Sequence, residues 1–378
     1  MSAGTIVLAG GGTGGHVFPL VAVAVALREL EPGLECVFVG TERGIETRVV
    51  PSRGYRLELM NVLPMRGNGL RGVVKGGLRA AGAVGEAREL LRQLSPRAVL
   101  SVGGYAAGPI ALAAALARIP LALLEPNSVM GFANRLIAPL VSRAYTAFEP
   151  VQRHFRRSVV LRSGVPLGPG FRPTPYELPP GGPVRVLVLG GSQGAVALNE
   201  TVPRALARLH PNLEIVHQAG PNHEAAVTRR YRDLGLADRA SVRVLPFIDD
   251  MPQAIAAASL VIGRAGASAV SEIAAVGRPS VLIPFPYAAG NHQLKNAQIL
   301  EDAGAALCVP QERATAGRLA ELVAGLLHDP SRLESMAAAA RVFGRPDAAR
   351  IVAEDLLRLA GVPSASQPDL ASALQGVS

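Results

Sequence analysis

Cysteine and aromatic residues are scarce in this sequence of 378 residues, and tryptophan is missing altogether. The two cysteines, Cys36 and Cys308, each lie within an apolar run typical of a strand. Two cysteines so far apart in the sequence supply neither a disulfide framework nor the spacing of a metal site. We therefore expect a protein of a reducing, cytosolic compartment.

A long apolar run is also missing. The most apolar stretch, residues 106–124, is interrupted by two prolines and an arginine. It is better explained as a core helix over 110–117 and a strand over 121–124 than as a membrane-spanning helix. The first four residues lead directly into a predicted strand, without the pattern of a signal peptide. These features predict a protein that is soluble or peripheral to a membrane.

Acidic residues are scarce in one half of the chain only. Residues 1–163 contain 19 Lys and Arg against 10 Asp and Glu, which accounts for the whole net charge of +9, and the remainder is balanced. A basic half predicts an anionic partner, such as nucleic acid, an anionic lipid or a phosphorylated substrate. An arginine-rich surface without a specific partner explains the charge equally well.

Short apolar strands alternate with helical segments in both halves of the chain, a pattern typical of a parallel sheet covered by helices. The first half predicts strands at 5–9, 35–39, 98–102, 121–124 and 144–147, and helices at 17–30, 43–52, 77–94, 107–117 and 131–139. The second half predicts strands at 184–189, 213–217, 242–245, 260–262, 280–283 and 306–309, and helices at 195–209, 222–234, 251–257, 267–276, 292–303, 315–327 and within 331–360. A linker rich in proline and glycine, 162–183, separates the halves. The sequence thus predicts an α/β protein with two Rossmann-like domains.

A glycine-rich turn, residues 10–15, joins the first predicted strand to the first predicted helix with the spacing G-x-G-x-x-G. Such a turn presents backbone N–H groups and the positive end of a helix dipole to an anion. His16 follows directly and places a titratable group at the mouth of the turn. Glycines and polar residues also follow two further strands, at 103–105 and 125–127, and parallel strands end at one edge of a sheet. We therefore expect the three clusters to converge, although the first spacing alone also occurs in ordinary tight turns.

The second half carries a comparable set of groups. A glycine turn over 190–194 follows one predicted strand, and the small residues of 263–269 follow another and open a helix. Glu272 lies on that otherwise apolar helix, where its carboxylate could accept both hydroxyls of a ribose; a solvated surface acid is the competing interpretation. Residues 291–297 begin the next helix with amides and an imidazole, which suit sugar hydroxyls, although Asn291 is equally a candidate for helix capping.

Two classes of enzyme fit two domains that each carry a glycine turn. A dinucleotide oxidoreductase needs an acid after the second strand, for which Glu42 is the candidate, but its second glycine turn then has no role. A nucleotide-sugar transferase uses one domain for the nucleotide and the other for the acceptor. Because Asp249 and Asp250 are adjacent, the sequence contains no D-x-D. We therefore expect backbone N–H groups and basic side chains, not a metal ion, to meet the charge of a diphosphate.

Residues 62–79 combine apolar and basic side chains and contain no acid. Their glycines and Pro64 predict a loop before the helix at 77–94. One interpretation is a contact with an anionic membrane, in which apolar side chains enter the lipid and basic ones meet the headgroups. An ordinary solvated loop is the simpler interpretation of these residues taken alone.

Taken together, the motifs resemble the MurG family, the bacterial transferases that move N-acetylglucosamine from UDP-GlcNAc to lipid I, undecaprenyl-pyrophosphoryl-MurNAc-pentapeptide. The resemblance spans about residues 5–360 and rests on an ordered series of motifs, at 11–19, 103–109, 127–131 with Asn134 and Arg135, 190–195, 247–251, 264–267 with Ser271 and Glu272, and 292–297.

The resemblance implies a GT-B fold, in which two Rossmann-like domains with parallel sheets face each other across a cleft. It implies an inverting transfer to the MurNAc 4-hydroxyl of lipid I, which forms lipid II for peptidoglycan synthesis, without a metal ion or a cofactor. The implied partners are UDP-GlcNAc, lipid I, the anionic inner membrane surface and other proteins of cell-wall synthesis, with no nucleic acid. The implied location is the cytoplasmic face of the membrane, and residues 62–79 match the family's proposed membrane-facing region.

The resemblance also implies how the chain is divided. It places an acceptor domain at 1–163 and a UDP-GlcNAc-binding domain at 164–340. A last helix within 341–360 is expected to return to the first domain, and 361–378 are expected to form a frayed tail.

Site residues follow from their positions in the motifs. The donor is expected to contact Ser192 and Ala267 through its phosphates, Ile248 through its uracil, Glu272 through its ribose, and His292 and Gln293 through its sugar. The acceptor side is expected to include Thr13, Gly14, Gly15, His16 and Asn127, with Asn127 close to the reacting centre. His16 is the first candidate for the general base because an imidazole titrates near the working pH, and Glu125 is the second.

The chain departs from the family pattern in three places. Leu124 and Pro126 replace a His and a Gln beside Glu125 and Asn127, residues 164–168 lack an arginine of the interdomain turn, and Ala269 replaces a Thr. The missing arginine most affects the expected binding of the diphosphate, and Arg162 and Arg172 are candidates to replace it. The alternatives that remain are a UDP-sugar epimerase, a transferase for another lipid or a soluble acceptor, and a protein that only binds. The scarcity of acids around the N-terminal motifs favours transfer over epimerisation.

Overall fold

The computed structural model describes residues 3–62, 70–104, 106–178, 182–209, 212–236 and 240–363, and over 70–81 it describes only the helical backbone. Contacts divide the chain into two compact units. The first contains the described residues of 1–126, 130–168 and 347–378, and the second those of 127–129 and 169–346. The sequence placed its domain limits at 163/164 and 340/341, and these limits of the functional domains stay a prediction.

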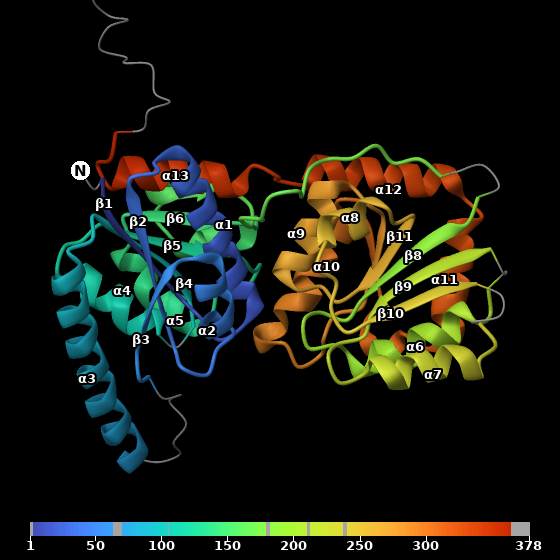
Figure 1. The fold of residues 1–378 in the computed structure, drawn as a ribbon, viewed down its shortest axis with the longest axis horizontal. Helices are drawn as coiled ribbons and strands as arrows, with labels where there is room; N and C mark the ends of the chain where they lie inside the picture. The colour runs from blue at the N-terminus through green and yellow to red at the C-terminus, as the bar shows by residue number, and fades with distance from the viewer. Residues whose placement is uncertain are drawn as a thin grey trace, which may run out of the picture. The chain divides into compact units, whose positions relative to one another are not determined.

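The first unit is a parallel sheet of seven strands with helices on both faces (Figure 1), in the order β3-β2-β1-β4-β5-β6-β7. Its strands are β1 (Gly4–Gly10), β2 (Leu34–Gly40), β3 (Arg56–Leu59), β4 (Ala98–Gly103), β5 (Leu121–Glu125), β6 (Arg143–Thr146) and β7 (Val160–Arg162). Its α-helices are α1 (Gly14–Leu30), α2 (Glu46–Val49), α3 (Leu70–Leu94), α4 (Ala107–Leu116), α5 (Phe132–Ile137) and α13 (Ala348–Leu359). Short 3-10 helices lie at η1 (Pro51–Arg53), η2 (Ala138–Leu140), η3 (Glu149–His154) and η4 (Arg157–Val159).

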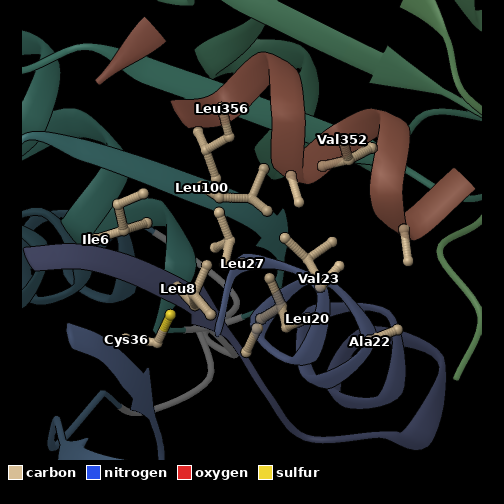
Figure 2. Close-up of a cluster of buried hydrophobic side chains, with 14 of the residues drawn as sticks. Ile6, Leu8, Leu20, Ala22, Val23, Leu27, Cys36, Leu100, Val352 and Leu356 are labelled. Atoms are coloured by element: carbon tan, nitrogen blue, oxygen red, sulfur yellow. The ribbon is translucent and has the colours of Figure 1, made fainter. Parts of the chain in front are cut away.

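Side chains of successive strand residues point to opposite faces of this sheet, so each strand contributes to two cores. Ile6 and Leu8 of β1 lie in the core under α1 and α13, which Figure 2 shows with Leu20, Leu27 and Leu356. Val7 and Ala9 of the same strand lie in the core on the other face, together with residues of α3, α4 and α5. Strand β1 is therefore apolar on both faces, as a central parallel strand between two helical layers is.

The last helix, α13, packs beside α1 in the first unit. Val352 and Leu356 enter its core, and the Tyr145 hydroxyl on β6 donates to Asp355 over 3.0 Å. Asp355 also pairs with Arg143 of β6 at 2.8 Å. Apolar packing and a buried polar contact thus join the C-terminal helix to the sheet built by the first 162 residues.

The second unit contains a parallel sheet of six strands, in the order β10-β9-β8-β11-β12-β13. Its strands are β8 (Val184–Leu189), β9 (Leu213–Gln218), β10 (Ser241–Leu245), β11 (Leu260–Gly263), β12 (Ser280–Leu282) and β13 (Ala306–Cys308). Its helices are α6 (Val196–Leu206), α7 (Glu224–Asp233), α8 (Met251–Ala256), α9 (Ala267–Val276), α10 (His292–Asp302), α11 (Ala316–Leu327) and α12 (Pro330–Phe343), with 3-10 helices η5 (Ala289–Asn291) and η6 (Gln311–Arg313). Apolar residues of α6, α7 and α11 cover one face of this sheet.

The predicted fold class is confirmed, as are all six predicted strands of the second half. The first sheet has two strands that the sequence did not predict, β3 and β7, and both are its edge strands. Two helix predictions were too long. Pro51 ends the helix expected over 43–52 after α2, and the helical segment expected over 331–360 is broken between α12 and α13, where Gly344 and Pro346 lie.

The loop expected over 62–79 was wrong in its second part. Helix α3 begins at Leu70, seven residues before the predicted start, and includes three glycines of the expected loop. Glycine weakens a helix by about 1 kcal/mol per residue without preventing it, and no proline lies between 70 and 94. Residues 63–69 and the side chains of 70–81 lie outside the described part, so the membrane contact expected there stays a prediction.

Candidate functional site

The glycine turn after β1 has the backbone that the sequence predicted. Gly12 has φ +91°, a conformation that favours glycine, and Thr13 is the N-cap residue of α1. The N–H groups of Gly14 and Gly15, the first two of the helix, have no hydrogen-bond partner among the described residues. Gly12, Thr13 and Gly15 are exposed. This end of α1 therefore presents two donors and the positive end of a helix dipole to an anion.

A buried carboxylate that the sequence did not reveal fills the inner side of this turn. Glu46, at the start of α2, is 1% exposed and accepts hydrogen bonds from the N–H groups of Gly12 and Thr41, each over 2.9 Å. A Cβ atom at Gly11 or Gly44 would overlap this carboxylate. A bound dinucleotide places its pyrophosphate at the Gly12 position of such a turn, and here an acid already bonds that N–H. Glu42, the acid considered for a dinucleotide site, is exposed instead.

His16 is held by the same turn. Its Nδ1 lies 3.2 Å from the carbonyl oxygen of Gly11. Since a carbonyl only accepts, Nδ1 carries the proton, and in the neutral ring Nε2 has the lone pair of a base. The backbone of Gly104, at φ +95°, lies against Gly11 and the ring, where a Cβ atom would be 3.0 Å from the Gly11 oxygen.

Part of each of the three clusters expected to meet at the end of this sheet does so within the first unit. Gly104 follows β4 and contacts the first turn, while Gly103 lies against the amide of Asn134. Asn134 in turn donates to Glu125 at the end of β5, over 2.9 Å. Glu125 is 2% exposed, so its carboxylate is part of a buried network beneath the turn. Tyr105, in the second of the expected clusters, lies outside the described residues.

Asn127 is grouped with the second unit, although it follows β5 closely. The next residue, Ser128, donates from its N–H to the Asn296 side chain of α10 over 3.1 Å. Asn296 also donates to the carbonyl of Ala265, over 3.1 Å. The segment 127–129 is therefore fixed beside the start of α10 and the end of β11.

The second glycine turn lies between β8 and α6. Gly191 and Gly194 have φ +83° and +78°, and a Cβ atom at Gly194 would overlap the carbonyl of Ala219. Ser192 is exposed at the tip of the turn. The turn thus has an open backbone and a hydroxyl at its surface, as a phosphate contact requires.

A second residue that the sequence did not single out, Gln218, joins this turn to Ile248. The Gln218 side chain donates from Nε2 to the carbonyl of Gly191 over 3.0 Å and accepts from the N–H of Ile248, also over 3.0 Å. Both Gln218 and Ile248 are buried. Because the N–H of Ile248 is already bonded, its carbonyl is the backbone group that remains to recognise a base with an N–H at its edge.

Helix α9 carries two polar side chains one turn apart without partners. The Ser268 hydroxyl is buried and has no hydrogen-bond partner. Glu272, four residues later on the same face of the helix, is partly buried and has no hydrogen-bond or ion-pair partner among the described residues. Burial raises the pKa of Glu272 from 4.5 to about 7. Ala267 opens the helix above them, with the N–H groups of its first turn pointing outward.

An unpaired buried hydroxyl and an acid with a raised pKa are costly in a folded protein unless a ligand uses them. Here they stand at the N-terminal half of a helix whose dipole favours an anion. The set suits a ligand that combines a phosphate with two neighbouring hydroxyls.

The start of α10 carries the remaining donor-side residues. Gln293 accepts the N–H of Phe285 through Oε1 over 3.0 Å, which leaves its NH₂ group as a donor. His292 Nδ1 lies 2.9 Å from the carbonyl of Ala289 and therefore carries the proton. Asn291 makes no capping hydrogen bond with its side chain. Capping therefore does not explain the amides at this helix start.

The described residues offer neither a metal site nor a membrane span. They contain no group of three or more His, Cys, Asp and Glu side chains arranged to bind a metal ion. In the same ranges no helix combines the length and the apolar character needed to cross a membrane.

Comparison with known proteins identifies the family. Residues 6–146 match the glycosyltransferase family 28 N-terminal domain, and residues 185–352 match its C-terminal domain. The chain is 54% identical, over 95% of its length and 89% of the other, to a UDP-N-acetylglucosamine–N-acetylmuramyl-(pentapeptide) pyrophosphoryl-undecaprenol N-acetylglucosamine transferase from Sorangium cellulosum. The chain belongs to the MurG family of glycosyltransferases.

Further relatives agree. A protein of the same description from Pseudomonas fluorescens is 43% identical over 95% of this chain and 99% of its own. The crystal structure of Acinetobacter baumannii MurG superimposes with a TM-score of 0.79 at 32% identity, over 94% of this chain and 99% of that one. The predicted family, the GT-B fold and the activity as a glycosyltransferase are therefore confirmed.

Proposed function

We propose that this MurG-family chain transfers N-acetylglucosamine from UDP-GlcNAc to the MurNAc 4-hydroxyl of lipid I, with inversion, and so forms lipid II for peptidoglycan synthesis. Relatives of 54% and 43% identity are named for this donor and for this lipid-linked muramyl acceptor. The single structural observation that carries the donor half is the unpartnered pair on α9, Ser268 and Glu272.

The donor contacts follow from what each group can offer. The ionised carboxylate of Glu272 accepts from both ribose hydroxyls, because a carboxylate only accepts and has two oxygens. The N–H groups at the start of α9, the Ser268 hydroxyl and the turn at Ser192 meet the diphosphate. The carbonyl of Ile248 accepts the N3–H of uracil, and His292 and the NH₂ group of Gln293 serve the sugar. No metal ion or cofactor enters this proposal.

The residues that we assign to the acceptor lie mainly in the turn after β1. The 4-hydroxyl oxygen attacks the anomeric carbon while the bond from that carbon to the UDP oxygen breaks, and UDP leaves with the electron pair. His16 takes the hydroxyl proton on Nε2, since Nδ1 donates to Gly11. The N–H groups of Gly14 and Gly15, with Thr13, face the acceptor, and Asn127 is assigned to the reacting centre.

Glu125 is the weaker candidate for the base. It is 2% exposed and its Oε2 accepts from Asn134 over 2.9 Å, whereas His16 is only partly buried. A base must reach the hydroxyl of a bound substrate. We therefore assign Glu125 a supporting role, in which it orients Asn134 and Gly103 beneath the turn.

We further propose that the chain binds the cytoplasmic face of the cell membrane through its first unit. The acceptor's undecaprenyl chain resides in a bilayer, and residues 1–163, which form most of this unit, carry the whole net positive charge. Phe132, Leu136 and Leu140 are exposed at intervals of four residues along α5 and η2, with Arg135 among them. Apolar side chains interleaved with basic ones fit an anionic lipid surface.

The experiment that tests the reaction is release of UDP from UDP-GlcNAc, with and without a short-chain analogue of lipid I. We expect release only with the analogue, and we expect His16→Asn to lose turnover while it retains donor affinity. Release without any acceptor, or donor binding without release when the analogue is present, would contradict the proposal.

A further inference from the structure

The buried carboxylate of Glu46 and the imidazole of His16 bind the two ends of one peptide group. Glu46 Oε2 accepts from the N–H of Gly12 over 2.9 Å. The carbonyl of the same peptide bond, that of Gly11, accepts from His16 Nδ1 over 3.2 Å. The three groups therefore form a chain from carboxylate through peptide to imidazole.

We propose that Glu46 is a positioning residue for His16, and that Glu46, the Gly11–Gly12 peptide and His16 act as a carboxylate–histidine dyad with a peptide group between its members. A carboxylate that bonds an imidazole directly fixes its tautomer and stabilises its protonated form. Here the carboxylate polarises the peptide, which makes the Gly11 oxygen a stronger acceptor for the Nδ1 proton.

The surroundings of Glu46 are built for this contact. A Cβ atom at Gly11, Gly40 or Gly44 would come within overlap distance of its side chain, so three glycines make the space that the acid fills. Oε1 is fixed in addition by the N–H and the hydroxyl of Thr41, at 2.9 and 3.1 Å. Among the described residues no cation pairs with this buried charge. Three hydrogen-bond donors, one of them in the catalytic turn, stabilise it instead.

Glu46 takes up no proton during the proposed reaction. As the 4-hydroxyl oxygen bonds to the anomeric carbon and the bond to UDP breaks, the hydroxyl proton moves to His16 Nε2. The Nδ1 proton stays on the ring and its hydrogen bond to Gly11 strengthens, because the ring is now positive. Glu46 exchanges no proton in this step, and its carboxylate favours the imidazolium through the polarised peptide.

The tautomer of His16 tests this arrangement directly, without any enzymatic assay. The chain has 7 histidines, so the ¹⁵N signals of His16 are assigned in a histidine-labelled sample by their loss in His16→Gln. The parent is expected to show the Nδ1–H tautomer when neutral, and Glu46→Gln a mixture of both. An Nε2–H tautomer in the parent would overturn the proposal, and this result does not depend on the folding of Glu46→Gln.

The kinetic part of the test rests on the proposed function, since it takes His16 as the base. For Glu46→Gln we expect kcat to fall about tenfold to a hundredfold, part of the effect a general base supplies, with the KM for UDP-GlcNAc within about threefold of the parent. Glu42→Gln is the matched control, because Glu42 is an exposed acid four residues earlier, in the loop before α2. Thr41→Val removes one hydroxyl donor but keeps the contact with Gly12, and should change kcat by less than about threefold.

Unchanged kcat in Glu46→Gln, or an equal fall in Thr41→Val, would overturn the role of Glu46. A wrong assignment of the base gives a different result: His16→Gln would then keep its turnover, while the ¹⁵N signals of the parent would still show the Nδ1–H tautomer. The failure of the dyad and the failure of the proposed reaction are therefore distinguishable.

Discussion

Glu272 should destabilise the unliganded protein at neutral pH and stabilise its complex with the donor. Its pKa rises from 4.5 to about 7 because burial disfavours the ionised form. At about 1.36 kcal/mol per pH unit, this difference corresponds to about 3 kcal/mol against the folded state once both states are ionised. Water reaches part of the side chain, so we expect about 1–2 kcal/mol in practice.

The sign of the effect sets the pH range. Below pH 4.5 Glu272 is protonated in the folded and unfolded states and contributes nothing. Between 4.5 and about 7 only the unfolded state loses the proton, so stability falls as the pH rises. Above about 7 the full penalty is present. Glu272→Gln, which has the same shape and no charge, should therefore raise the unfolding temperature by a few degrees at pH 8 and leave it unchanged at pH 4.5.

The same substitution, Glu272→Gln, should raise stability but lower the affinity for UDP. Hydrogen bonds from two ribose hydroxyls to a carboxylate contribute about 2–3 kcal/mol, so Glu272→Gln should bind UDP about 30-fold to 150-fold more weakly. The parent should lose UDP affinity as the pH falls below about 7, because the protonated acid accepts poorly.

Calorimetric titration with UDP and with its 2′,3′-dideoxy analogue separates the ribose contact from the rest. The parent should discriminate strongly between the two ligands, and Glu272→Gln weakly.

The control for stability is Glu321→Gln, because Glu321 is an exposed acid on α11. The reasoning is refuted if Glu272→Gln is no more stable than the parent at pH 8, or if it retains the parent's affinity for UDP.

Three further predictions concern single contacts. Ser268→Ala should leave the unliganded protein as stable as the parent or more stable, because it removes an unpaired buried hydroxyl. It should lower the affinity for UDP by roughly 3-fold to 30-fold. Thermal unfolding with and without UDP measures both effects. Gly104→Ala should lower kcat while leaving donor affinity intact, because a Cβ atom at φ +95° would press on the Gly11 carbonyl that holds the histidine; equal kcat in steady-state assays would contradict this. Leu136→Glu should reduce cosedimentation with anionic vesicles, whereas Val342→Glu, an exposed apolar position in the second unit, should not; equal loss in both would argue against a membrane contact by α5.

Local pattern predicts most of this fold because the strands are apolar on both faces and bounded by glycine turns. Strands β8, β11 and β12 of the second sheet are apolar and mostly buried, and each was predicted. The two missed strands are edge strands: β3 reads Arg-Leu-Glu-Leu, and β7 has only three residues. Such segments pair because a neighbouring strand offers its edge, which no local pattern records.

In the candidate site, too, the features carried by a local pattern were predicted and those that depend on distant residues were not. The glycine turns, Glu272 and the polar start of α10 were predictable because their spacing within one element carries the signal. Glu46 was not, since its partner Gly12 is 34 residues away and an isolated Glu after a loop is typical of a surface. Gln218 is a similar case, because its two contacts, at Gly191 and Ile248, come from different loops.

The chemical structure of the product tests the central claim most directly. The chain is incubated with UDP-GlcNAc and a short-chain lipid I analogue, and the product is characterised by mass and by NMR of the new glycosidic bond. The account predicts one N-acetylglucosamine added in β-linkage to the 4-hydroxyl of MurNAc, in an amount equal to the UDP released. An α-linkage, an epimerised sugar, or UDP without a glycosylated analogue would contradict it.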